Sequence, residues 1–186
     1  MPSGALGYPS GVGERQVQIV ELLASPVHRF EGRPSDGPRP APDDESVAAI
    51  DLRAGLGIVG DRFFAQRAHR DSSVTVQSAE SLDAVGAALG VAVPNLAQTR
   101  RNILLRGADV DGLAGEPFSL DCGTGEVLFS AAKACRPCAW LNVTVGDGAH
   151  RAFRDRGGIR TGPLADGRLT LGPAILRTGA DVGISA

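Results

Sequence analysis

The chain has 186 residues, and its 19 basic side chains nearly balance its 21 acidic ones, for a formal net charge of −2. A protein of this charge has no global field to collect nucleic acid or anionic membrane, which disfavours a dedicated duplex-binding module. Aromatic residues make up only 4% of the chain, whereas glycine occurs 25 times and proline 12 times, which favours many turns and short strands over a helical bundle.

The N-terminus predicts a tail that precedes one folded unit. Met1–Gly13 is rich in Gly, Pro and Ser without periodicity, so we expect a flexible tail, followed by a single domain over residues 14–180. Residues 31–44 contain four prolines among several charges, which indicates an exposed loop or insertion. No apolar run approaches the ~20 residues that cross a bilayer, and no leader pattern is present, so we expect no membrane association and a cytoplasmic location.

Short strands make up most of the predicted secondary structure. Val17–Leu22 alternates at period two, and Val47–Leu52 and Ser72–Val76 are further strand candidates. Shorter apolar runs bounded by Gly, Asp or Pro follow at 103–105, 118–120, 127–129, 169–171 and 174–176. Such spaced strands predict a mainly β fold, a barrel or a sandwich with few helices.

Two local signals add detail to this prediction. Leu82, Val85 and Leu89 recur at helical spacing after Ser78, and Gly90 supplies a stop, which predicts one helix. Asp166-Gly167, between Leu164 and Leu169, is typical of a hairpin turn because glycine tolerates the positive φ that such turns need.

The segment with the strongest chemical signal is Cys135-Arg136-Pro137-Cys138, since nearby positive charge from Lys133 and Arg136 stabilises a thiolate. The third cysteine, Cys122, leaves an odd number that cannot all pair internally. Four interpretations stay open. They are a thioredoxin-type redox pair, half of a zinc site, one nucleophilic or metal-binding thiolate with an optional neighbour, and buried cysteines that act only as small apolar residues.

Basic and amide side chains near other turns indicate an anion site. Arg62 follows Gly60-Asp61, and Arg100-Arg101-Asn102 precedes a strand, so guanidinium forks and an amide are available for phosphate or a polar heterocycle. Six basic residues against two acidic ones lie between Lys133 and Arg160, which forms either an anion pocket or a solvated basic face. Arg156 precedes Gly157-Gly158, whose backbone amides could approach an anion or form a plain turn. His69 and His150 are either proton donors or surface groups.

Four ordered motifs give the sequence a resemblance to a known family. Gly60-Asp61-Arg62-Phe63, Thr99-Arg100-Arg101-Asn102-Ile103, Leu113-Ala114-Gly115-Glu116-Pro117-Phe118 and Cys135-Arg136-Pro137-Cys138 together resemble the MOSC domain, named for the C-terminal domain of molybdenum cofactor sulfurase. The resemblance runs from about Val17 to Leu176. It implies a strand-rich β-barrel that holds a molybdopterin-type molybdenum cofactor.

The resemblance also implies roles for individual residues. Cys138 would be the catalytic cysteine that ligates molybdenum or carries sulfur as a persulfide, and Cys135 would be an accessory thiol. Arg62, Arg100 and Asn102 match positions that meet the pterin and its phosphate, with Arg101 and Arg136 as neighbouring candidates and Arg156 as an accessory one. Cationic forks suit a phosphate and a soft thiolate suits molybdenum.

Two activities are compatible with this resemblance. In the first, the chain reduces small N-hydroxylated compounds with electrons from a partner protein, and in the second, Cys138 relays sulfur from a donor protein as a persulfide. A third hypothesis is a non-catalytic barrel that binds a small anion. Pyridoxal phosphate is disfavoured in this chain, because its only lysine, Lys133, lies beside the cysteine motif.

Overall fold

The computed structural model describes residues 13–179. The predicted flexible tail therefore lies outside the described residues except for Gly13, which is the first residue of a strand. The strands are β1 (Gly13–Leu22), β2 (Ala49–Arg53), β3 (Gly57–Ile58), β4 (Val74–Ser78), β5 (Ile103–Arg106), β6 (Phe118–Asp121), β7 (Glu126–Phe129), β8 (Lys133–Ala134), β9 (Ile159–Thr161), β10 (Gly167–Thr170) and β11 (Gly172–Thr178). The helices are α1 (Ala79–Leu89), α2 (Leu96–Thr99), α3 (Trp140–Thr144) and α4 (Ala149–Ala152), with short 3₁₀ turns η1 (Pro34–Asp36), η2 (Arg67–Ser72) and η3 (Asp111–Leu113).

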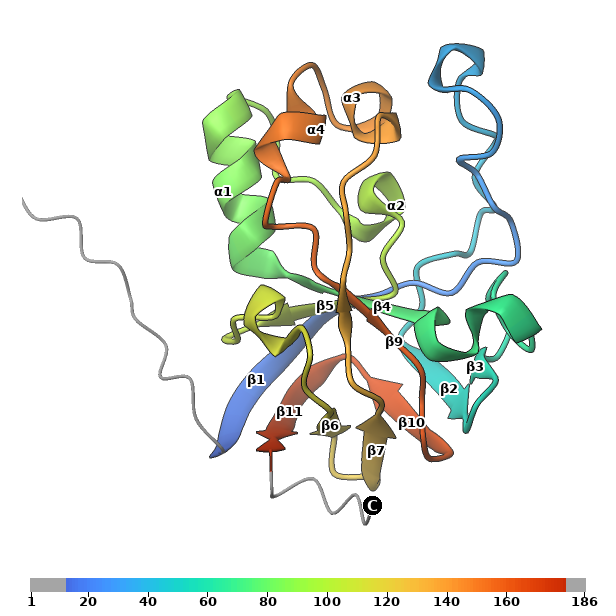
Figure 1. Ribbon diagram of the computed structural model, residues 1–186, viewed down its shortest axis with the longest axis vertical. Coiled ribbons are helices and arrows are strands. Elements are labelled where there is room, and N and C mark those ends of the chain that lie inside the picture. The colour runs from blue at the N-terminus through green and yellow to red at the C-terminus, as the bar shows by residue number, and fades with distance from the viewer. Residues whose placement is uncertain (1–12, 180–186) are drawn as a thin grey trace, which may run out of the picture.

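Eight of the strands form one curled sheet in the order β7-β6-β11-β1-β5-β4-β9-β8, and β10, β2 and β3 form a second, smaller sheet (Figure 1). Neighbouring strands are antiparallel except for β4 and β5, which run parallel. The predicted fold class, a β-rich barrel with a few short helices, is confirmed. In the part of the chain that the structure describes, no helix has the length and apolar character of a membrane span.

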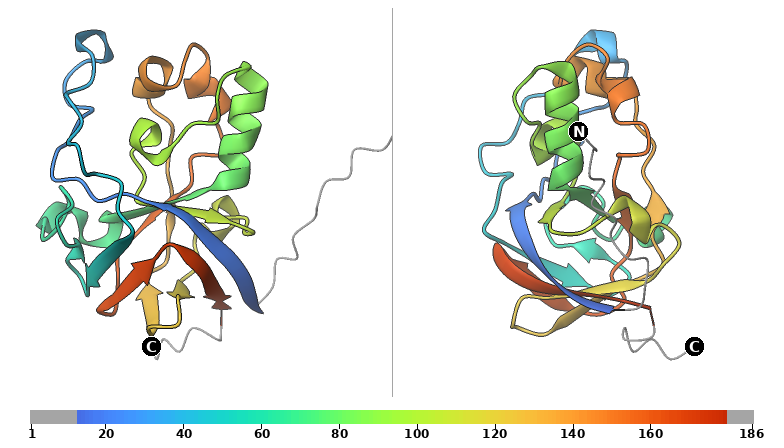
Figure 2. Two further views of the ribbon diagram at one scale, coloured as in Figure 1. Left: turned by 180° about the vertical axis from the view of Figure 1, so that it is seen from behind. Right: turned by 90° about the vertical axis from the view of Figure 1, so that its left-hand side faces the viewer.

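The apolar core has two parts, one inside the barrel and one under the helices. Inward-facing strand residues such as Ile19, Val76 and Leu105 fill the barrel, as expected for alternating side chains on a sheet with one buried face. The second cluster joins Leu82 of α1, Leu141 of α3 and Phe153 to the outer face of the sheet. Figure 2 shows that the helices gather at one end of the barrel, and the site described below lies where this helical layer meets the sheet.

Capping residues explain where the two central helices begin and end. The Ser78 hydroxyl accepts a hydrogen bond from the Ser81 amide at 3.3 Å, and α1 ends at Gly90 with φ of +66°, a conformation that glycine adopts without strain. Asn95 caps α2 in the same way by accepting from the Gln98 amide at 2.9 Å. The left-handed residue after α2 is Arg100, with φ of +57°. A non-glycine residue pays steric strain in this conformation, so other contacts must hold Arg100 there.

The predicted hairpin at Asp166-Gly167 is wrong. β10 pairs with β2 rather than with the strand that precedes it, and the Asp166 carboxylate accepts from the Ala54 amide at 2.8 Å beside an ion pair with Arg53 at 3.2 Å. A turn signal reports that the chain changes direction but carries no information about which distant strand the next segment will join.

Candidate functional site

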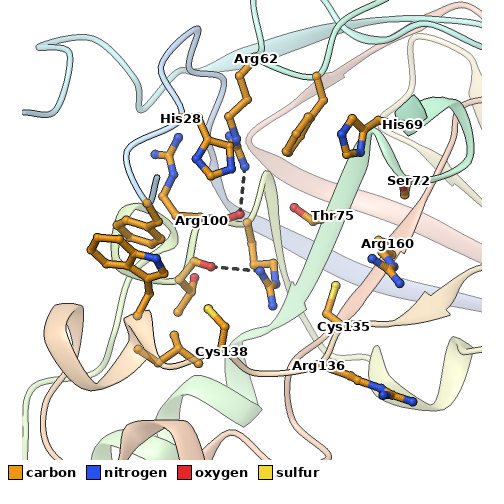
Figure 3. Close-up of a pocket in the computed structure, with 16 residues that line it drawn as sticks. His28, Arg62, His69, Ser72, Thr75, Arg100, Cys135, Arg136, Cys138 and Arg160 are labelled. Atoms are coloured by element: carbon orange, nitrogen blue, oxygen red, sulfur yellow. Dashed lines mark hydrogen bonds between the residues drawn. The ribbon is translucent and has the colours of Figure 1, made fainter. Parts of the chain in front are cut away.

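A cavity of about 290 Å³ opens between the sheet and the helical layer (Figure 3). It collects side chains from six separate segments of the chain. The lining residues are His28, Phe30, Arg62, Phe63, His69, Ser72, Thr75, Thr99, Arg100, Arg101, Cys135, Arg136, Cys138, Trp140, Leu141 and Arg160. None of them is Asp or Glu, so cationic and aromatic side chains dominate the wall.

Both cysteines of the Cys135–Cys138 loop, which joins β8 to α3, line this cavity. The Cys135 amide donates to the Gly158 carbonyl at 2.8 Å, and the Cys138 carbonyl accepts from the Leu141 amide at 3.1 Å, so both ends of the loop are fixed. Cys138 is exposed and Cys135 half-buried. Burial raises the pKa of the Cys135 thiol, although the nearby positive charges of Arg101 and Arg160 act in the opposite direction. The exposed Cys138 is therefore the accessible thiol of the pair.

The two glycines at 157 and 158 let the chain pass directly behind the cysteine loop. A Cβ on Gly157 would lie 2.1 Å from the Cys135 carbonyl oxygen, and one on Gly158 would lie 2.2 Å from the Val76 carbonyl oxygen. The Gly158 amide donates to the Asp111 carboxylate at 2.8 Å, so it has a protein partner already. Close backbone packing therefore explains why both positions are glycine.

Arg62 reaches the opposite side of the cavity from the cysteines (Figure 3). It forms a buried ion pair with Asp61 at 3.3 Å, and its guanidinium lies 4.5 Å from the Phe63 ring centroid. Burial lowers the pKa of Arg62 to about 10; the Asp61 charge opposes this shift, and the charges of Arg100 and Arg101 add to it. Arg62 therefore remains a cation at neutral pH, held beside an aromatic ring.

Asn102 is not among the residues that line the cavity. Its amide nitrogen donates to the Leu23 carbonyl and to the Asp61 carboxylate, each at 3.1 Å, and its oxygen accepts from the Thr75 amide at 3.0 Å and from the Thr75 hydroxyl at 2.8 Å. Its hydrogen-bonding capacity is thus used within the protein. Asn102 supports the site by holding Asp61 and Thr75, which flank it.

Arg100 lines the cavity but is largely committed to neighbouring protein groups. Its guanidinium donates to Glu45 at 2.9 Å and to the Val27 carbonyl at 2.9 Å, and both Arg100 and Glu45 are buried. These bonds tie the turn after α2 to the segment at residues 27–45. They also supply the contacts that keep Arg100 in its left-handed conformation. Burial lowers the pKa of Arg100, while the Glu45 carboxylate acts to raise it.

Arg101, Arg136 and Arg160 line the cavity without neutralising partners. Arg101 donates to the carbonyls of Gly157 at 3.0 Å and Thr99 at 3.1 Å. Within residues 13–179, no carboxylate lies within ion-pair distance of these three guanidinium groups. They are the cations of the cavity whose charge is free to meet an anion.

Aromatic rings and two histidines complete the wall. The Phe63 ring lies between His28, at a centroid distance of 5.9 Å, and His69, at 4.4 Å. Phe30 stacks on Trp140 at 5.4 Å, which joins the Pro-rich loop region to the helix that follows the cysteines. The pKa of His28 is lowered, first by partial burial and then by the charges of Arg62 and Arg100. This wall suits a flat, partly apolar group beside the cations.

The structure thus brings together most of the residues that the sequence singled out. Cys135, Cys138, Arg62, Arg100, Arg101 and Arg136 all line one cavity, whereas Asn102, Arg156 and His150 do not. Sequence reasoning missed His28, Phe30 and Trp140 as wall residues, whereas Arg160 belonged to the basic segment that was expected to form an anion pocket or a solvated face. His28 and Phe30 carry no local motif.

A zinc site is not formed by the described residues. Among residues 13–179, no three His, Cys, Asp or Glu side chains gather closely enough to hold a metal ion. Cys122 lies apart from the cavity, with its sulfur 3.7 Å from the Thr170 carbonyl oxygen. Among the described residues the cysteine loop therefore brings two thiols to the cavity but no complete zinc site.

Comparison with known proteins gives a family match and several structural neighbours. The MOSC domain family matches residues 57–182. The YuaD protein from Bacillus subtilis is similar at 15% identity and a TM-score of 0.70, covering 91% of this chain and 99% of that one. YiiM from Geobacillus stearothermophilus, at 14% identity, has a TM-score of 0.59 and covers 90% and 77%, and YiiM from Escherichia coli, at 14%, has 0.53 and covers 91% and 72%. No curated protein matches the sequence. At these identities the structural likeness concerns the fold alone.

Proposed function

This chain belongs to the MOSC domain family, and on that premise we propose that it holds a molybdopterin-type cofactor through Cys138 and reduces small N-hydroxylated compounds. The observation that carries this proposal is the convergence in one cavity of an exposed thiol with three guanidinium groups that have no carboxylate partner. In this proposal a separate protein supplies the electrons.

The donor set of the cavity fits such a cofactor. Cys138, an accessible thiol at the cavity wall, would supply the soft ligand that holds the cofactor's metal. The pterin phosphate needs cationic partners, and an acidic lining would repel it. No Asp or Glu lines the cavity, and cations face it from several sides.

The arginines that have no carboxylate partner have a different proposed role from those that form ion pairs. Arg101, Arg136 and Arg160 are the candidates to bind the cofactor's phosphate, because their charge is not used by a carboxylate. Arg62 and Arg100 lie in buried ion pairs with Asp61 and Glu45, so they shape the wall and contribute at most their remaining N–H groups. Asn102 is a positioning residue rather than a cofactor contact. This division refines the expectation from sequence, which placed Arg62, Arg100 and Asn102 on the cofactor.

The reaction consumes two electrons and two protons: a hydroxylamine R–NHOH becomes R–NH₂, the N–O bond breaks, and the oxygen leaves as water. When bound, the cofactor supplies the two electrons and the site at which the substrate oxygen is taken. Of the side chains that line the cavity, His28 and His69 are of the type that exchanges protons near neutral pH. Phe63, between these two rings, supplies an apolar contact for the substrate.

A second function is supported by the same loop. A persulfide relay needs an accessible thiol, and Cys138 is exposed and lines the cavity, with a second thiol, Cys135, three residues away in the chain. In this alternative a cysteine desulfurase transfers a sulfane sulfur to Cys138, which holds it as a persulfide until an acceptor removes it. Incubation with desulfurase and cysteine would then add the mass of one sulfur to Cys138.

Elemental analysis separates these proposals. The protein would be purified from a host that makes molybdenum cofactor, and molybdenum and the oxidised pterin fluorophore would be quantified in the wild type, in Cys138→Ser and in Cys122→Ser. We expect stoichiometric metal and pterin in the wild type and in Cys122→Ser, whose thiol lies outside the cavity, with loss of both in Cys138→Ser. Folded wild type that contains neither metal nor pterin would overturn cofactor binding and leave the sulfur relay to be tested by mass spectrometry.

A further inference from the structure

Exposed basic side chains surround the cysteine loop. Lys133, Arg136, Arg156 and Arg160 are all solvent-exposed, and we call this set the basic rim. Between residues 13 and 179, none of the four forms an ion pair. The exposed Asp155, next to Arg156 in the chain, is the nearest carboxylate in sequence. The rim is therefore a local patch of positive charge on a chain whose net charge is −2.

Several arginines elsewhere on the barrel form ion pairs with acidic side chains. Arg168 lies 2.9 Å from the Asp51 carboxylate, and Arg106 lies 2.8 Å from that of Asp83. Arg177 contacts three acidic residues within 3.9 Å. Part of the positive charge on other faces is thus neutralised, although Arg33, Arg67 and Arg70 are also exposed without an ion pair among the described residues. The basic rim differs in that four cations without an ion pair lie around one loop, the one that carries the two cysteines.

Two members of the rim face each other directly across a strand pair. In the β8–β9 register Lys133 is the partner of Arg160, so their side chains project from the same face of the sheet. Like charges at directly opposed positions destabilise an antiparallel pair. β8 is also the edge strand of the large sheet, where a partner can approach. A ligand that places negative charge over this accessible edge would reduce the repulsion between Lys133 and Arg160.

The backbone contacts fix the rim close to the reactive thiols. Arg136 lies between the two cysteines in the chain, and Gly157, which follows Arg156, packs against the Cys135 carbonyl. In Figure 3, Arg136 and Arg160 lie at the side of the cavity that holds Cys135. An anionic molecule that covers the rim would therefore lie beside the part of the cavity wall that holds Cys135.

The spread of the rim favours a large ligand over a small one. Arg136 and Arg160 line the cavity, but Lys133 and Arg156 lie outside it, so the four charges do not converge on a single point as they would around one phosphate. A single-stranded nucleic acid would need exposed rings on which its bases stack. The exposed large apolar side chains of the described residues are all aliphatic, and the aromatic rings Phe30, Phe63 and Trp140 belong to the cavity wall.

We propose that the basic rim is the docking surface for an acidic protein that delivers electrons to the site at Cys138. The inference rests on the proposed function only in that the reaction needs a protein donor. Charge complementarity of this kind speeds encounter and orients the partner, and its effect falls with ionic strength. Docking here would bring the partner's redox group over the cavity mouth.

Binding of an acidic flavodoxin, used as the probe, tests this surface. The association rate constant would be measured by surface plasmon resonance with the full chain, at about 20 mM and about 500 mM salt. The test variant is Lys133→Glu/Arg156→Glu, because neither residue lines the cavity. The matched control is Arg33→Glu, which reverses the charge of an exposed arginine without an ion pair on the Pro-rich loop. Molybdenum content is measured in every variant.

We expect the double variant to lose about tenfold in association rate at low salt, with the difference largely gone at high salt, while Arg33→Glu binds as the wild type. Equal losses in the test and control variants would overturn the proposal, as would absence of flavodoxin binding at low salt. Binding of single-stranded DNA or phosphatidylserine vesicles in place of flavodoxin would also overturn it and reassign the surface. If the wild type lacks molybdenum but the rim variant alone loses flavodoxin binding, the cofactor proposal falls and the docking surface stands.

Discussion

The Asn102 amide nitrogen donates a hydrogen bond of 3.1 Å to the Asp61 carboxylate, although the two residues are 41 positions apart and both are buried. Asp61 also accepts from the amides of Ser25 at 3.3 Å and Phe63 at 3.0 Å and pairs with Arg62. The pair thus connects the strand region after α2 to the loop that presents Arg62 to the cavity. Removing either partner leaves the other buried with an unmet polar group.

Asn102→Ala should therefore destabilise the protein even without any ligand. Its loss deprives Asp61, Thr75 and the Leu23 carbonyl of a partner, which costs about 3 kcal/mol in the free energy of unfolding and lowers the melting temperature by roughly 6–12 °C. Urea unfolding of cofactor-free protein would measure this. The control is Asn142→Ala, because the exposed Asn142 makes one bond, to the His150 amide at 2.8 Å. If Asn102→Ala matched the wild type in stability but lost cofactor, Asn102 would be a ligand contact after all.

The outline of the fold could be predicted because its signals are local. Alternation through Val17 and Ile19 marks β1, and Ser78 and Gly90 mark both ends of α1. Strand pairing is not local, and the Asp166-Gly167 turn shows this, since β10 joins β2 instead of folding back on its predecessor. The two-residue strand β8 is too short for any periodicity to reveal.

The candidate site could be predicted as a set of residues but not as a set of roles. The cysteine motif and the arginines follow from residue type and order. Whether an arginine is free or neutralised depends on partners far away in the chain, such as Glu45 for Arg100, which no local pattern indicates. For the same reason His28 and Phe30 became visible as wall residues only when the fold placed them beside Trp140 and Phe63.

The buried Arg100–Glu45 pair makes a second prediction about stability. Arg100→Met leaves the Glu45 carboxylate buried with only Arg29 nearby, at 3.6 Å, and should cost about 3–5 kcal/mol in unfolding free energy. Removing both charges in Arg100→Met/Glu45→Met should recover more than half of that loss, because no buried carboxylate is left without its closest partner and only the partly exposed Arg29 loses an ion pair. A double-mutant cycle by urea unfolding checks this. Additive losses would show that the two side chains are not coupled.

Gly157→Ala should disturb the cysteine loop specifically. The new methyl group would lie 2.1 Å from the Cys135 carbonyl oxygen, so the loop must move. We expect at least a tenfold loss of molybdenum affinity, with a cost of about 1–3 kcal/mol in stability from the strain. Gly123→Ala is the control, because it lies at a turn with open space around the added carbon. Its loss of stability should come from backbone strain alone, without any displacement of the cysteine loop. Wild-type metal content in Gly157→Ala would mean that the position of this loop does not matter for the site.

The alkylation of Cys135 should depend on pH differently from that of an ordinary thiol. Only the thiolate reacts, and burial raises the pKa of Cys135, so its alkylation by iodoacetamide should keep rising at pH values where an ordinary thiol has already levelled off. Mass spectrometry of Cys138→Ser, with Cys122 also replaced, follows Cys135 alone. Arg101→Gln should shift that profile to still higher pH, because the Arg101 charge favours the Cys135 thiolate. A profile that levels off at the ordinary thiol range, or one that Arg101→Gln leaves in place, would show that Cys135 is neither as buried nor as close to Arg101 as the structure has it.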